Sequence, residues 1–261
     1  MKNTFNVSYV TKFPKLGSVP IVSISGSEFH NYKVLVSELI DTNWEIANSG
    51  YCQTNTSIVF RCKQWVTKWK VEILDESDNI IHIDEFNPKG RVIFIKFDAW
   101  ALGDTIAWIP YVEEFRKKHE CIVICSTFHN NLLIDSYPNI LFVKPNTTID
   151  NVYAQYYVGA SNEDNEFYSP IKVNENPLQD VACRILGLEP IEIQPNLSFK
   201  YVNQKPFISE KYVTLSEFGS CVDKHWKVDD GWQTLVNYLN DKGYKVVVIS
   251  KEKTNLKGVI D

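Results

Sequence analysis

One stretch of this chain, residues 91–118, combines a buried strand, a tight turn and an amphipathic helix. Its first part, Val92–Phe97, is an apolar run with β-branched residues, which is typical of a strand buried on both faces. The later apolar residues recur at three-residue intervals on one helix face: Ile106, Ile109, Val112 and Phe115. A buried strand that leads directly into such a helix predicts a parallel α/β sheet.

The turn between strand and helix reads Ala-Leu-Gly-Asp-Thr, residues 101–105. Gly103 lets a ligand approach the backbone closely, and the helix start beyond it offers N–H groups that can hold an anion. Asp104 is expected at the carboxyl edge of the sheet, where open α/β folds place their chemistry. It is our candidate catalytic acid or base. The alternative is that Asp104 only caps the helix, because Asp is a preferred N-cap residue.

The length of 261 residues allows two domains, and 44% hydrophobic residues allow substantial cores. The net charge of −5 gives no general attraction to nucleic acid or to anionic membranes. The lysines within 63–70 are expected on a solvated β surface. The N-terminus lacks the apolar core of a secretory signal, and no apolar run is long enough to span a bilayer. We therefore expect a cytoplasmic protein.

Six cysteines occur, and none forms a C-x-x-C pair. Cys121 and Cys125 lie four residues apart in a predicted strand, so their side chains share a face. We expect buried free thiols, no disulfides and no metal site.

The pattern changes twice along the chain. Residues 1–88 contain short β-rich runs, with turn signals at 48–50 and 75–79, and predict a small β domain that is a sandwich or an open barrel. Residues 89–207 alternate strands and helices and predict a first Rossmann-like domain. Residues 208–261 hold one further strand–helix–strand unit, the beginning of a second Rossmann-like domain.

A second candidate site follows the strand that contains Tyr212. Its loop carries the small polar residues Ser216 and Ser220, followed by Lys224. Small residues let backbone N–H groups meet a phosphate, and lysine supplies a positive charge. Neither a Walker A spacing nor a G-x-G-x-x-G fingerprint occurs, which argues against a P-loop protein and a nicotinamide or flavin enzyme. The nearby Trp226 is expected to be a packing residue.

Gly103-Asp104 and Lys224-His225-Trp226 match two motifs of the GT-B glycosyltransferases that use ADP-heptose, a Gly-Asp at the first strand-to-helix turn and a Lys-x-Trp in the second domain. Longer stretches resemble the TibC-like autotransporter O-heptosyltransferases. They are FDAWALGDTIAWIPYVEEFRKKH, STFHNNL, YPNI and GWQTLVNYLNDKGYKVVVISKE. The resemblance implies GT-B-like Rossmann halves, the second one incomplete, preceded by a β-rich domain.

This resemblance also implies a reaction. The donor would be ADP-heptose and the acceptor would be serine hydroxyls of an autotransporter passenger. Asp104 would act as the general base, and Lys224 would lie at the donor diphosphate. Gly103, Thr105, Ser216 and Ser220 would help to bind substrate. TibC-like proteins carry a cysteine-ligated iron in their C-terminal part, but the cysteines here lie elsewhere, so no cofactor is expected.

TibC-like proteins also assemble into large rings. GT-B enzymes hold the nucleotide with a later loop of the second domain, which this sequence does not contain. The alternative is therefore that this chain is a catalytically incomplete fragment. Such a chain would bind the acceptor or depend on a partner, which could be further copies of itself or a separate C-terminal half.

Overall fold

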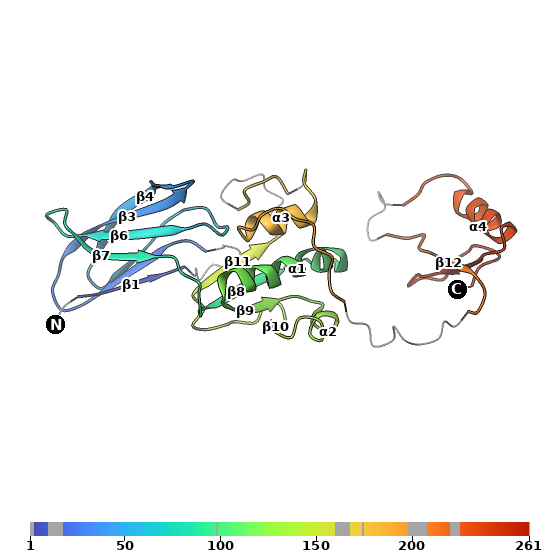
Figure 1. Ribbon diagram of the computed structural model, residues 1–261, viewed down its shortest axis with the longest axis horizontal. Helices are drawn as coiled ribbons and strands as arrows, with labels where there is room; N and C mark the ends of the chain where they lie inside the picture. Colours follow the sequence, from blue (N-terminus) through green and yellow to red (C-terminus); the bar gives the residue numbers. More distant parts are fainter. Residues whose placement is uncertain are drawn as a thin grey trace. The chain divides into compact units, whose positions relative to one another are not determined.

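The computed structural model describes residues 3–9, 18–97, 99–159, 168–173, 175–197, 208–219 and 225–260. The chain folds as two compact units, Met1–Phe199 and Lys200–Asp261 (Figure 1). Each is described by itself below. The first unit contains two antiparallel sheets followed by a parallel sheet, and the second contains a single strand–helix–strand unit.

The antiparallel sheets of the first unit face each other across an apolar interior. One has the order β1-β2-β5 and the other the order β4-β3-β6-β7. Their strands are β1 (Thr4–Ser8), β2 (Ile21–Ser25), β3 (Asn31–Ile40), β4 (Asn43–Gln53), β5 (Thr56–Val59), β6 (Trp69–Leu74) and β7 (Ile80–Glu85). Alternate residues such as Val22 and Ile24 on β2 and Val34 and Val36 on β3 are buried. This alternation confirms the predicted β-rich region and gives it two layers.

The predicted turn at 48–50 is wrong, because these residues lie inside β4 and pair with β3. Gly50 occurs there because a Cβ atom would lie 2.9 Å from a methyl carbon of Ile58. Asn48 donates a side-chain hydrogen bond of 2.9 Å to the carbonyl oxygen of Arg61. Gly50 and Asn48 therefore allow β4 to pack closely against the segment that contains Ile58 and Arg61. The turn predicted at 75–79 is confirmed and joins β6 to β7.

The parallel sheet follows in the order β10-β9-β8-β11. Its strands are β8 (Val92–Phe97), β9 (Ile122–Ser126), β10 (Ile140–Val143) and β11 (Ala154–Val158). Three helices accompany them: α1 (Leu102–His119), α2 (Asn130–Leu133) and α3 (Leu178–Ile185). The central strand β8 has Ile93, Phe94 and Ile95 buried, as expected of a strand covered on both faces. This arrangement confirms the predicted Rossmann-like fold.

Helix α1 covers the parallel sheet with a wider apolar face than the three-residue spacing predicts. Ile109, Val112 and Phe115 are fully buried, but Ile106 is only half-buried. Trp108 and Tyr111 are buried as well. Helix α1 packs against both β9 and α3. Because of these two contacts, Trp108 and Tyr111, which lie outside the predicted apolar face, are also buried.

The antiparallel and parallel sheets meet near the predicted boundary at residue 88. The last antiparallel strand ends at Glu85 and the first parallel strand begins at Val92. Both regions contribute to one apolar core, in which Trp69 and Ile93 are members of the same cluster. The boundary therefore marks a change of sheet type within one compact unit.

The second unit consists of β12 (Tyr212–Leu215), α4 (Gly231–Asp241) and β13 (Lys245–Val248). Strands β12 and β13 pair in parallel, which confirms the predicted strand–helix–strand unit. Among the described residues, its own small core contains four buried apolar residues: Leu215, Val236, Val246 and Val248.

Candidate functional site

The first candidate site lies at the carboxyl ends of the central strands β8 and β9. Strand β8 pairs with β9 on one side and with β11 on the other. The chain runs from β8 to β9 and β10 and then crosses back to β11, so the strand order reverses between β8 and β11. In open parallel sheets, ligands bind in the crevice at such a switch point. Helix α1 begins there, five positions after the last residue of β8. Gly103, Asp104 and Thr105 thus lie where the sequence predicts.

The N-terminus of α1 lacks a side-chain cap. The N-cap residue is Ala101, and no side-chain hydrogen bond closes this end of the helix. Gly103 is exposed, and apart from its chain neighbours and the backbone of its own helix, a Cβ atom at this position would meet no described atom within 4 Å. Packing within the described chain therefore gives no reason for glycine at this position, whereas close approach of a ligand would.

Asp104 is the third residue of α1, so the alternative that it serves as the N-cap is wrong. Its side chain is half-buried and makes no hydrogen bond or ion pair with the residues that the structure describes. The positive end of the helix macrodipole favours a carboxylate in this first turn. Asp104 is therefore a charged group at the switch point whose oxygens are not engaged by the described protein.

Thr105 is fully buried, and its hydroxyl oxygen lies 3.2 Å from that of Thr127. Thr127 follows β9, so this pair connects the start of α1 to the end of the neighbouring strand. The connection fixes the turn that carries Asp104. Direct contact of Thr105 with a substrate stays a prediction.

Two aromatic residues that the sequence analysis missed lie beside this turn. The rings of Trp100 and Phe128 are stacked, with centroids 4.0 Å apart and an angle of 20° between their planes. His129 Nε2 lies 2.9 Å from the carbonyl oxygen of Trp100. The available signal was an aromatic residue in each loop that follows a predicted central strand, but only the fold brings the two loops together.

The second candidate site is described only in part, because Ser220 and Lys224 lie outside the described residues. Ser216 follows β12 and is exposed, and its hydroxyl lies 3.4 Å from the carbonyl oxygen of Phe218. Trp226 packs edge-on against Trp232 with ring centroids 4.9 Å apart. Trp226 thus packs against Trp232, as predicted, but 44% of its surface remains exposed.

The described cysteines, Cys52, Cys62, Cys121, Cys125 and Cys183, are free and buried, as predicted. Burial raises the pKa of Cys121 to about 11 and raises that of Cys125 as well, so both thiols are protonated near neutral pH. Within the described part of the chain, no group of three or more His, Cys, Asp or Glu side chains could hold a metal ion. These residues therefore do not fit an iron site.

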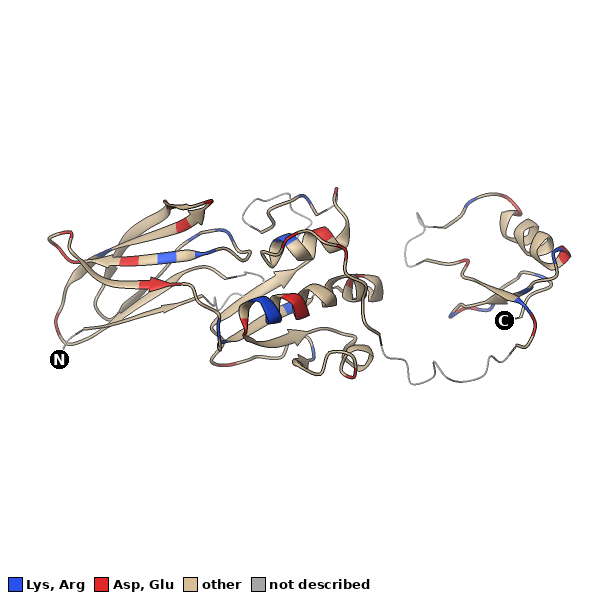
Figure 2. Cartoon of the chain, viewed as in Figure 1, with Lys and Arg blue, Asp and Glu red and all other residues tan. Residues whose placement is uncertain are grey.

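Charged side chains of both signs are interspersed over the chain (Figure 2). In the 63–70 segment, Lys63 lies 2.8 Å from a carboxylate oxygen of Glu38, and Lys70 lies 3.3 Å from one of Glu72. These lysines are therefore ion-paired. None of the helices in the described part of the chain is long and apolar enough to cross a membrane.

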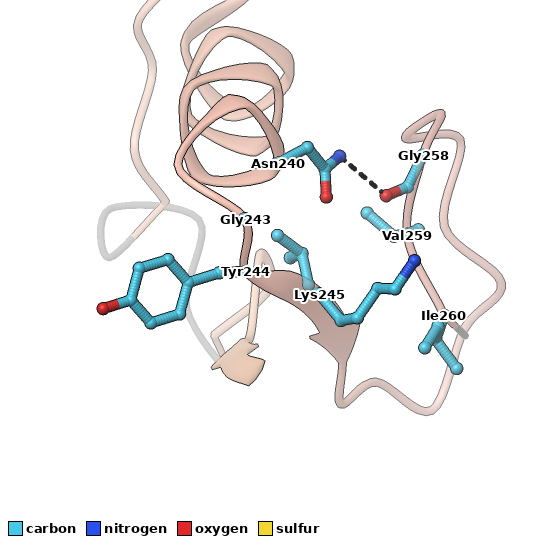
Figure 3. A pocket seen from close by; sticks show the side chains of 8 residues that line it. Asn240, Gly243, Tyr244, Lys245, Gly258, Val259 and Ile260 are labelled. Atoms are coloured by element: carbon cyan, nitrogen blue, oxygen red, sulfur yellow. Dashed lines mark hydrogen bonds between the residues drawn. The ribbon is translucent and has the colours of Figure 1, made fainter. Parts of the chain in front are cut away.

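A groove of about 490 Å³ lies elsewhere, in the second unit (Figure 3). Its lining includes Lys245 at the amino end of β13, and one rim is held by a hydrogen bond of 2.9 Å from Asn240 to the carbonyl oxygen of Gly258. Ligand sites of parallel sheets lie at the carboxyl ends of the strands, whereas this groove lies at the amino end of β13, opposite the end of the β12–β13 sheet that Ser216 follows.

No family model matches this sequence. The autotransporter heptosyltransferase Aah of Escherichia coli is 30% identical over 204 residues, which are 77% of this chain and 51% of Aah. TibC of Escherichia coli O78:H11 is 27% identical over 207 residues, covering 77% of this chain and 50% of TibC. The inactive autotransporter heptosyltransferase BimC of Burkholderia thailandensis is 25% identical over 201 residues, 76% of this chain and 47% of BimC. This chain thus spans about half the length of these curated relatives.

The fold matches crystal structures of TibC from enterotoxigenic E. coli H10407. One, described as a dodecameric iron-containing glycosyltransferase, has a TM-score of 0.82 at 20% identity and covers 98% of this chain and 66% of TibC. A second holds ADP-D-β-D-heptose and gives a TM-score of 0.81 at 20% identity, with the same coverage of 98% and 66%. In sequence this chain is similar to the autotransporter heptosyltransferases, and it shares the fold of TibC.

Proposed function

We propose that this chain catalyses transfer of heptose from ADP-heptose to serine hydroxyls of an autotransporter passenger, with Asp104 as general base. The relatives Aah and TibC support the reaction class, and the TibC complex supports the donor. The chain spans about half of these relatives, so the activity is a proposal for this chain.

The observation that carries the proposal is the position of Asp104. Its carboxylate lies at the switch point of the parallel sheet and is not engaged by the described residues. A serine hydroxyl is a weak nucleophile, and a carboxylate within hydrogen-bond reach can accept its proton. As the serine oxygen bonds to the anomeric carbon of heptose, the bond from that carbon to the diphosphate breaks and ADP leaves.

The negative charge of Asp104 favours binding of the serine acceptor beside it and disfavours binding of the donor's diphosphate there. A carboxylate in the first turn of α1 repels a second anion, although the helix start alone would attract one. In our proposal the diphosphate instead meets Lys224, which stabilises the negative charge that develops on ADP. Ser216 and Ser220 complete that loop, while Gly103 leaves room for substrate and Thr105 holds the turn.

The remaining features of the proposal follow from the relatives. TibC is described as dodecameric, which supports a homo-oligomer as one form of this protein. We also propose that the acceptor is modified in the cytoplasm before export. No cofactor is required for the step described above, and no step is assigned to iron.

The test compares Asp104→Asn with Asp180→Asn. Asp180 is the matched control, because it also occupies the first turn of a helix and its substitution loses the same interaction with a helix dipole. Purified proteins are incubated with ADP-heptose and a passenger domain, and the addition of heptose is followed by mass spectrometry. We expect Asp104→Asn to lower kcat roughly 10²- to 10⁴-fold, and Asp180→Asn to leave it unchanged. Equal rates for the two variants would remove Asp104 from the proposed mechanism.

A second candidate function is binding of the acceptor without turnover. The observation that favours it is the relative BimC, which is described as inactive although it matches 76% of this chain. This alternative predicts a stable complex with the passenger and no transfer by the purified chain. Turnover by the purified chain would eliminate it.

A further inference from the structure

Beside Asp104, the chain presents a large aromatic surface to solvent. Trp100 is 77% exposed, although indole is among the side chains that lose most by contact with water. One face of its ring rests on Phe128, with centroids 4.0 Å apart. The stacked pair therefore forms a flat platform, which the described residues cover on one side only.

The platform is held in place by a chain of polar contacts. His129 Nε2 lies 2.9 Å from the carbonyl oxygen of Trp100, so this nitrogen carries the ring proton and donates it. The backbone N–H of His129 donates to the hydroxyl of Thr127 at 3.3 Å. Thr127 pairs in turn with Thr105, the residue that follows Asp104. The same contacts thus fix both the platform and the turn that carries the proposed base.

From this geometry we propose that Trp100, supported by Phe128, is a positioning residue that stacks against the pyranose ring of the transferred heptose. This inference rests on the proposed function. A pyranose ring presents a face of polarised C–H groups, which fits the electron-rich face of an aromatic ring. The ring would thereby be held next to Asp104, where the anomeric carbon must meet the serine oxygen.

The position of the platform favours a sugar over an extended peptide. Peptides that bind to sheets add a strand to an exposed edge. The edge strands of this sheet are β10 and β11, whereas Trp100 and Phe128 follow the central strands β8 and β9. Small ligands bind at the carboxyl ends of the strands in open parallel sheets, next to the switch point, which here borders β8.

The test uses saturation-transfer NMR and calorimetric titration of the full chain with ADP-heptose and with ADP. Trp100→Ala removes the platform and Trp100→Phe keeps an aromatic face. Phe29→Ala is the matched control, because Phe29 is 74% exposed and lies outside the site. We expect Trp100→Ala to abolish saturation of the heptose ring protons, retain that of the adenine protons, and weaken ADP-heptose binding roughly three- to tenfold. ADP binding should not change, and Trp100→Phe should restore most of the loss.

Two results would overturn the inference in different ways. Retained saturation of the heptose protons in Trp100→Ala, with unchanged affinity for ADP-heptose, would show that the platform does not hold the sugar while leaving the proposed function intact. Absence of any ADP-heptose signal with the folded wild-type chain would reject the proposed donor, and the platform proposal with it.

Discussion

Gly103 is a residue whose identity the described fold does not require. It lies in the first turn of α1, is exposed, and has room for a Cβ atom. Glycine inside a helix costs stability relative to alanine, because it loses more backbone freedom on folding. This open space agrees with our proposal that a substrate approaches the backbone at Gly103.

Gly103→Ala separates stability from function at this position. We expect the free energy of unfolding to increase by about 0.5–1 kcal/mol, because alanine favours the helix, while the KM for donor or acceptor rises. Urea titration measures the first effect and steady-state transfer kinetics the second. A more stable protein with unchanged kinetics would leave Gly103 without a role in binding.

Gly159 differs, because packing does require glycine there. Its φ angle is +83°, and a Cβ atom would collide with the indole of the buried Trp108. We expect Gly159→Ala to lower the free energy of unfolding by about 1–3 kcal/mol, through backbone strain and displacement of Trp108. Urea titration with tryptophan fluorescence measures the change. A variant as stable as the wild type would contradict the close packing of this loop against α1.

Helix α1 carries the candidate base at its start and a half-buried histidine, His119, at its end. The His119 ring packs at a tilt against the Phe115 ring, with centroids 4.4 Å apart and 47° between the ring planes. Its Nε2 atom is buried without a hydrogen-bond partner among the described residues. Burial lowers the pKa of His119 to about 4, and Lys118 adds to this shift. The ring is therefore neutral in the folded protein near neutral pH.

This lowered pKa gives the helix a pH dependence of known sign. The unfolded chain protonates His119 near pH 6.5 and the folded chain only near pH 4, so the unfolded state binds more protons between these values. We expect stability to fall by about 1–2 kcal/mol as the pH drops through this window, a figure reduced for the partial exposure of the ring. His119→Gln should remove this component of the slope. Parallel pH profiles of the two proteins, measured by urea titration, would refute the assignment.

At the scale of the whole molecule, the two compact units have separate cores of different size. The first core extends through antiparallel and parallel sheets, whereas the second contains four buried residues. Because small cores bury little apolar surface, we expect the second unit to unfold at the lower temperature.

A pair of matched variants tests this separation. Val112 and Val236 are both fully buried, one in each unit. Each substitution by alanine should lower the free energy of unfolding of its own unit by about 1–3 kcal/mol. In scanning calorimetry we expect Val236→Ala to shift only the lower transition and Val112→Ala only the upper one. A single transition that both variants shift equally would show that the units unfold together.

The sequence by itself determined the elements whose patterns are local. The apolar run Val92–Phe97 and the helix after it are confirmed. Burial of a strand on both faces leaves a continuous apolar run in the sequence, and burial of one helix face leaves apolar residues at helical spacing. The position of Asp104 after the carboxyl end of β8 follows from the same strand–turn–helix pattern, whereas the switch point beside it depends on the order of the strands. Ser220 and Lys224 lie outside the described residues, so their roles stay predictions.

Only the tertiary structure decided the contacts between residues that are distant along the chain. The residues at 48–50 are typical of a turn, yet β4 continues through them because its ladder with β3 and the space needed by Ile58 outweigh local preference. Likewise, the Trp100–Phe128 stack and the Thr105–Thr127 pair join loops that meet because β8 and β9 are neighbours in the sheet. Such pairings depend on which strands lie side by side, and no local spacing in the sequence records that choice.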